Sequence, residues 1–121
     1  MALYSKAVTI TTTAATKVFT VPTGFKAHVS YIFLENHSSN DVDMDLFIRE
    51  HHGDGTHTDV YLMDSTELKT AEPKEFYNGI FVMHEGDFLQ AQLDTAEDNV
   101  VIVATFDLLE EDAFLVNFGH G

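Results

Sequence analysis

Apolar and polar residues alternate with a period of two along most of this 121-residue chain. The clearest case runs from Val42 to Ile48, where four apolar side chains alternate with two aspartates and a phenylalanine. Successive side chains of a β-strand point to opposite faces of the sheet, so this pattern predicts a strand with one buried face. The stretches 89–94 and 100–108 alternate in the same way. A chain built of such segments is expected to form antiparallel sheets.

Turn-forming residues separate the alternating segments. Pro22-Thr23-Gly24 predicts a tight turn, because proline fixes one φ and glycine allows a positive one. Before it, the Thr- and Val-rich stretch 7–21 favours strand throughout, and 27–36 is expected at the middle of a sheet. Polar loops are predicted at 36–41 and 50–57, and 59–63 is expected to be a strand. The turn 84–87 is predicted to close a hairpin between 80–83 and 88–94, whereas 67–74 fits either a connection or a turn of helix.

About eight short strands at intervals of roughly 8 to 12 residues predict an all-β fold, an antiparallel β-sandwich or jelly roll with extended termini. The length fits one sandwich domain, expected over residues 1–108, with 109–121 as a C-terminal extension. The extension is acidic at first and then apolar. Its apolar residues are expected to bind a partner, either as an edge strand of their own domain or on a neighbouring subunit. They are Phe114, Leu115, Val116 and Phe118.

The charge balance narrows the range of partners. Six Lys and Arg residues face twenty Asp and Glu residues, a formal net charge of −14. Such a surface repels phosphate backbones and anionic lipids, so neither nucleic acid nor membrane is an expected partner. The chain has no cysteine, which removes disulfides, thiolate metal sites and cysteine nucleophiles.

The segment 51–59 is the richest in possible metal ligands. The candidate ligands are His51, His52, His57 and Asp59, and imidazole with carboxylate suits zinc or nickel. Adjacent histidines of an extended chain point to opposite sides, and no two histidines here have the spacing of two or four that would preset a site. A solvated polar loop is the competing interpretation, and no cofactor is expected.

No catalytic residues are predicted, and the chain is not expected to be an enzyme. It lacks the His-x-His pair of cupins, and none of its serines lies in a Gly-x-Ser-x-Gly elbow. Asp41, Asp43 and Asp45 resemble a calcium motif only superficially, because residues two apart on a strand are first of all its solvent face.

Three motifs combine turn residues with strand segments. The first is Thr20-Val21-Pro22-Thr23-Gly24 within 16–32, the second is Asn36 before Ser38-Ser39, and the third is Gly86-Asp87-Phe88-Leu89 after Val60-Tyr61-Leu62. With these motifs the chain resembles small virion proteins of tailed bacteriophages, over roughly residues 7 to 108 and in its turn and strand chemistry.

The resemblance implies a β-sandwich accessory subunit of a phage particle. A capsid decoration (cement) protein would bind the major capsid protein, form homotrimers and reside in the virion after assembly in the host cytoplasm. A neck, tail or tail-fibre adaptor that binds other virion proteins is the alternative. From a different class, a carbohydrate- or metal-binding module around His51, His52, His57 and Asp59 remains open.

Overall fold

The computed structural model describes residues 3–70, 73–76, 81–95 and 99–110, and these form nine strands. Among them no helix is found, and so none that is long and apolar enough to cross a membrane. The strands are β1 (Leu3–Ile10), β2 (Thr16–Thr20), β3 (Phe25–Asn36), β4 (Val42–His51), β5 (His57–Leu68), β6 (Pro73–Phe76), β7 (Phe81–Met83), β8 (Phe88–Leu93) and β9 (Val100–Glu110).

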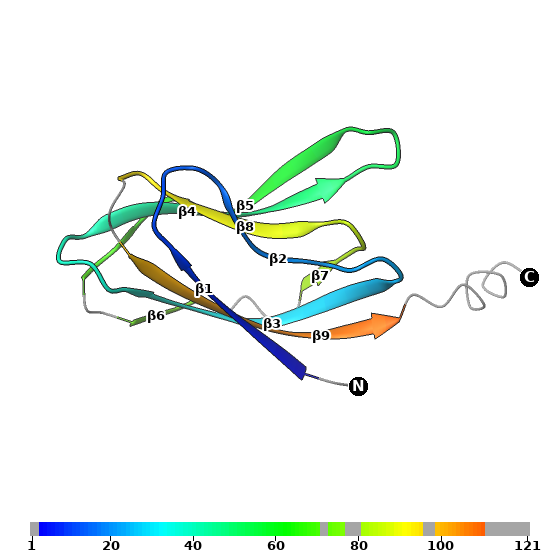
Figure 1. Cartoon of the computed structure of the whole chain (residues 1–121), viewed down its shortest axis with the longest axis horizontal. Helices are drawn as coiled ribbons and strands as arrows, with labels where there is room; N and C mark the ends of the chain where they lie inside the picture. Colours follow the sequence, from blue (N-terminus) through cyan, green and yellow to red (C-terminus); the bar gives the residue numbers. More distant parts are fainter. Residues whose placement is uncertain (1–2, 71–72, 77–80, 96–98, 111–121) are drawn as a thin grey trace, which may run out of the picture.

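The strands form two sheets that pack face to face (Figure 1). Sheet A has the order β1-β9-β3-β6, with β7 also paired to β3, and sheet B has the order β2-β8-β4-β5. Every ladder between named strands is antiparallel. When β6 and β7 are taken as one interrupted strand beside β3, each sheet has four strands in the order of a jelly roll. The predicted fold class is therefore confirmed.

The core lies between the sheets and follows the alternation of the sequence. Val42, Met44, Leu46 and Ile48 of β4 point inward as predicted, and β9 contributes its own alternate residues from sheet A. Full burial of an aliphatic side chain of this size contributes roughly 1.5 to 3 kcal/mol. Strand β3 lies between β9 and the pair β6 and β7, which confirms its predicted place at the middle of a sheet.

The prediction of strand throughout 7–21 is wrong between β1 and β2. These two strands belong to different sheets, and the chain turns between them. The Thr12 hydroxyl donates to the Ala14 carbonyl over 3.1 Å and accepts from the Ala14 N–H over 2.8 Å. Leu93 N–H also donates to the Thr12 carbonyl over 3.0 Å. The local hydroxyl turn therefore overrides the strand preference of β-branched residues.

The predicted hairpin over 80–94 is also wrong. Strand β7 pairs with β3 in sheet A, whereas β8 pairs with β2 and β4 in sheet B. The turn itself forms, with Gly86 at a φ of 85° and Asp87 N–H donating to the His84 carbonyl over 3.0 Å. The same turn chemistry serves a connection between sheets, because it does not determine which strands pair.

The strand ends define two boundaries more closely than the sequence did. Residues 67–68 end β5 and 73–74 begin β6, so the described part of 67–74 holds no helical turn. Strand β9 continues to Glu110, two residues beyond the predicted end of the sandwich domain.

Candidate functional site

The His-rich segment is the tip of the β4–β5 hairpin. The ladder runs out to the pair His51 and His57, and His52 N–H donates to the Thr56 carbonyl over 2.9 Å across the turn. Gly55 adopts a φ of 91°, which a residue with a Cβ rarely does. The predicted polar loop is thus an ordered hairpin turn, and Figure 1 shows it extending away from the sandwich.

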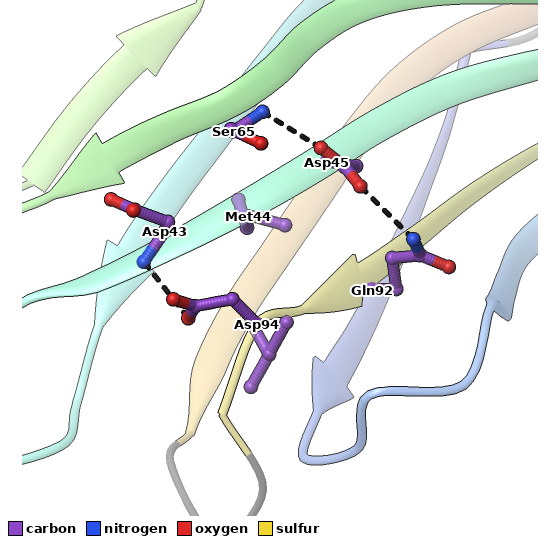
Figure 2. Close-up of a pocket in the computed structure, with 7 residues that line it drawn as sticks. Asp43, Met44, Asp45, Ser65, Gln92 and Asp94 are labelled. Atoms are coloured by element: carbon purple, nitrogen blue, oxygen red, sulfur yellow. Dashed lines mark hydrogen bonds between the residues drawn. The ribbon is translucent and has the colours of Figure 1, made fainter.

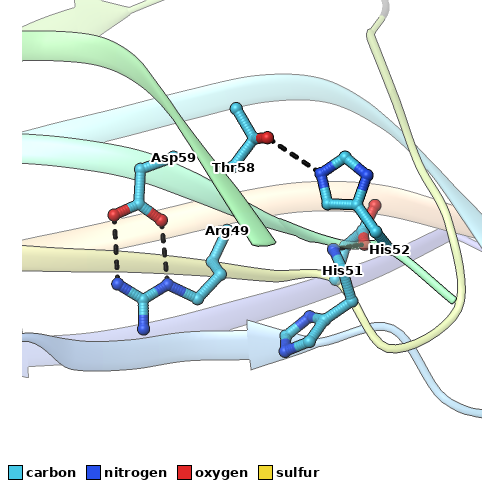
Figure 3. A network of polar contacts seen from close by, with 6 residues as sticks. Arg49, His51, His52, Thr58 and Asp59 are labelled. Atoms are coloured by element: carbon cyan, nitrogen blue, oxygen red, sulfur yellow. Dashed lines mark hydrogen bonds and ion pairs between the residues drawn. The ribbon is translucent and has the colours of Figure 1, made fainter. Parts of the chain in front are cut away.

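Three of the four candidate metal ligands, His51, His52 and Asp59, have separate partners. The His51 ring lies 5.3 Å from the Phe88 ring, and His52 Nε2 lies 2.8 Å from Thr58 Oγ1. Figure 3 shows the rings of His51 and His52 pointing in different directions, with Asp59 engaged by an arginine. Among the described residues, no three His, Cys, Asp or Glu side chains are placed to hold a metal ion. The metal site stays a prediction that this geometry does not support.

Arg49 and Asp59 form the strongest polar pair of this hairpin. Arg49 Nε donates to Asp59 Oδ1 over 2.8 Å, and its Nη2 donates to Oδ2 over 3.0 Å. These hydrogen bonds hold the pKa of Asp59 below its ordinary value and raise that of Arg49. The two residues face each other across the β4–β5 ladder. The pair therefore stabilises the strand register near the tip.

The pair gives the hairpin a pH dependence. Because the pKa of Asp59 is lower in the folded chain than in the unfolded one, its stabilisation is complete above the unfolded pKa and is lost as the pH falls through the folded pKa. We expect the stability difference between the wild-type chain and Arg49→Gln to shrink as the pH falls from about 6 to about 3. Urea unfolding at a series of pH values measures it. Lys69→Gln, which removes an exposed partner of Glu67, is the control, and a difference for Arg49→Gln that ignores pH would contradict the assignment.

The first and third motifs of the resemblance meet at one end of the sandwich. Val21 N–H donates to the Asp87 carbonyl over 2.9 Å, and Gly86 N–H donates to the Val21 carbonyl over 3.0 Å. Gly24, at a φ of 87°, donates its N–H to Glu85 Oε2 over 3.2 Å. The β2–β3 turn is therefore bound to the β7–β8 turn. We refer to this arrangement as the Asp87 clasp.

The Asp87 carboxylate extends the clasp to the His-rich hairpin. It is only 3% exposed, and it accepts the His84 N–H over 3.0 Å and the His51 N–H over 2.9 Å. A carboxylate that accepts two backbone N–H groups is a strong hydrogen-bond acceptor. One side chain thus connects the β7–β8 turn to the end of β4.

The second motif forms a clasp around Asn36. The residue is 1% exposed at the end of β3, and its Nδ2 donates to the Asn40 carbonyl over 2.7 Å and to the Leu68 carbonyl over 2.9 Å. Its Oδ1 accepts the Ser38 N–H over 2.9 Å and the Ser38 hydroxyl. This Asn36 clasp ties the β3–β4 loop to the end of β5. A sequence signal for it existed, since an Asn at the start of a polar loop favours an Asx turn, in which its side chain bonds the backbone two residues on.

Sheet B carries a small acidic pocket of about 220 Å³, lined by residues of β4, β5 and β8 and by Asp94 (Figure 2). Asp45 accepts the Ser65 N–H over 2.7 Å and the Gln92 amide over 2.9 Å, and Asp94 accepts the Asp43 N–H over 3.2 Å. Ser65 has a φ of 47°, where the β4–β5 register shifts. Asp45 therefore holds a β-bulge in place, which the prediction of a solvated aspartate face did not include.

The partner-binding residues Phe114, Leu115, Val116 and Phe118 lie outside the described residues. The last described strand nevertheless fixes where the extension leaves the fold. Glu110 ends β9 opposite Phe25 of β3, close to where β1 begins.

Comparisons with known proteins give a likeness at the level of structure. No protein-family model matches the chain, and no curated protein matches it. Thirteen chains of solved structures match. One belongs to the structure of infectious bursal disease virus, Gt strain, with 9% identity, a TM-score of 0.42 and coverage of 96% of this chain. The match covers 44% of the viral chain, so this chain spans less than half of its length.

Proposed function

We propose that this chain is a structural subunit of a phage particle, and more specifically a capsid decoration protein that stabilises the shell by binding across capsomers. The supporting observation is what the residues of the three phage-like motifs do in the fold. Asn36 and Asp87 are buried and hydrogen-bonded, and they hold the connections at the two ends of the sandwich. Their hydrogen bonds fix the turns at both ends of the sandwich, which suits a subunit that keeps its shape in an assembly.

The charge of the chain is consistent with such a role. A net charge of −14 keeps closely spaced copies soluble and away from packaged nucleic acid. Weak attachment of each copy is sufficient, because several sites on a symmetric shell act together. A decoration protein therefore needs a stable body and exposed termini more than it needs a deep binding pocket.

The proposal is tested by loading purified protein onto capsid shells of the encoding phage that lack it. We expect full-length protein to load in many copies per shell, measured by light scattering and by the protein ratio in sedimented shells. A chain ending at Glu110 keeps β9 intact but lacks the extension. We expect this chain to load at least about tenfold more weakly, because the extension takes part in multivalent attachment.

The control variant carries His52→Ala and His57→Ala, two exposed histidines of the hairpin tip. We expect its loading to equal that of the wild-type chain. Loss of loading in this variant alone would favour the binding-module alternative. If full-length protein does not bind shells, the decoration role is overturned. If it binds in only a few copies per particle, a neck or tail protein is the better interpretation.

A further inference from the structure

Strand β1 leaves a free edge at the margin of sheet A. It pairs with β9 through eight consecutive residues without a register shift, and no described strand pairs with its other side. The other sheet margins are less regular, since β2 is interrupted by a register shift, β5 has two, and β6 has four residues. A straight strand without proline or glycine presents unpaired backbone groups that a further strand can bind.

The free edge is also apolar at its start. Leu3 is 71% exposed and Tyr4 is 46% exposed. The Tyr4 ring stacks on Phe106 at 5.9 Å, and Phe106 stacks on Phe19 at 4.2 Å, so a row of aromatic rings runs from the core to the edge. A strand added beside β1 would cover Tyr4 and continue this row. Figure 1 shows β1 at the outside of its sheet, with its first residues near the end of β9.

Lys6 restricts which strand the edge accepts. It lies opposite the fully buried Ala104, so its side chain is on the core-facing side of an edge strand. Within the described residues Lys6 has no ion-pair partner. Pairing of two β1 edges would bring two Lys6 ammonium groups together, which disfavours that contact. A segment that brings carboxylates next to this edge would, in contrast, neutralise the charge.

The chain contains one segment with the matching chemistry. Residues 111–121 begin with Glu111 and Asp112, continue with the stretch 113–118, which is apolar except for Asn117, and contain no Lys or Arg. They follow Glu110, where β9 ends near the start of β1. Fully extended, 111–121 reach roughly 36 Å, enough to extend past the domain that carries them.

We propose that residues 113–118 of one copy add as an antiparallel strand to the free edge of β1 in a second copy. If the segment turned back onto β1 of its own copy, it would run parallel to β1, because β9 and β1 are antiparallel. All ladders between named strands are antiparallel, and parallel pairing is slightly weaker. A segment from another copy approaches from either direction, so it can continue the antiparallel pattern.

This exchange makes the subunit an oligomer. Each copy offers one segment and accepts one, so identical contacts close into a ring when the rotation between copies permits it. The inference deepens the proposed function by naming a second copy as the partner of the extension, but it concerns the free protein and can be tested without shells.

The absence of cysteine allows a direct test, because any introduced cysteine is unique. Chains carrying Ser5→Cys on exposed β1 are mixed with chains carrying Leu115→Cys or Val116→Cys and then oxidised gently. The two adjacent positions cover both faces of the added strand, and paired strands bring Cα atoms within disulfide range. We expect disulfide-linked dimers of about twice 13.5 kDa that contain one chain of each kind. Their yield should be at least tenfold higher than in control mixtures in which Asp64→Cys on β5 replaces Ser5→Cys.

Two outcomes would overturn the inference. One is a link that forms only within a chain carrying both Ser5→Cys and Val116→Cys, which would place the segment on its own copy. The other is the absence of mixed dimers together with unchanged association of the chain ending at Glu110. Lys6→Glu provides a second measurement: we expect at least a tenfold weaker association by light scattering, with Lys69→Glu unchanged.

The two proposals fail separately. Mixed dimers without loading onto shells would leave this contact in place and overturn the decoration role. Loading in many copies without mixed dimers would support the decoration role and overturn the contact between β1 and the extension of a second copy.

Discussion

Replacing Asp87 with alanine is expected to lower the free energy of unfolding by about 3 kcal/mol, one of the two largest effects expected for a single polar residue in the described part of the chain. The carboxylate is buried and accepts the backbone N–H groups of His51 and His84. Alanine leaves both donors without a partner at a position with little access to water. Urea unfolding followed by circular dichroism measures the change.

Two variants make this prediction specific. Asp64 is an exposed aspartate of β5, and we expect Asp64→Ala to change stability by no more than about 0.5 kcal/mol. Asp87→Asn keeps the size of the side chain but places an amide nitrogen where one N–H donor needs an acceptor, so we expect an intermediate loss. If Asp87→Ala behaves like Asp64→Ala, the clasp does not stabilise the fold.

Much of the fold could be predicted because the burial of one strand face produces a local alternation of apolar and polar residues in the sequence. In β4, Val42 and Met44 face the core while Asp43 and Asp45 face outward, and the alternation alone predicts this. Which strands pair with each other produces no such local pattern. The turn at Gly86 has the same residues whether β7 pairs with β8 or with β3, so the sequence predicted a hairpin where the chain changes sheet.

The candidate site was harder to predict for a related reason. Each clasp joins segments that are distant in the sequence, such as Val21 with Asp87 and Asn36 with Leu68. The turn residues were visible, but the contact between the turns depends on tertiary structure. The burial of Asn36 also runs against the usual preference of asparagine for the surface. The motifs thus predicted turns, whereas the structure shows that these turns hold distant segments together.

Replacing Asn36 with alanine is expected to cost about 3 to 4 kcal/mol, because the buried Leu68 carbonyl loses its donor and the Ser38 N–H loses its acceptor. Asn36→Asp separates these two effects. It preserves an oxygen for Ser38 but sets a carboxylate against the carbonyl oxygens of Leu68 and Asn40. Repulsion and burial raise the pKa of the new carboxyl group in the folded chain above its unfolded value.

The new carboxyl group makes the stability of Asn36→Asp depend on pH. A raised folded pKa means that ionisation costs stability, and the cost disappears once the pH falls below the unfolded pKa. We expect Asn36→Asp to lose about as much as Asn36→Ala at pH 7, and to recover part of that loss near pH 4, where the protonated carboxyl again donates a hydrogen bond. The exposed loop variant Asn40→Asp, measured by the same urea titrations, should show neither the loss nor the recovery. Equal behaviour of the two Asp variants would mean that the Asn36 amide does not hold β5 to the β3–β4 loop. A loss of unfolding free energy that appears only in Asn36→Asp and shrinks on acidification would show that the amide nitrogen makes the stabilising hydrogen bonds.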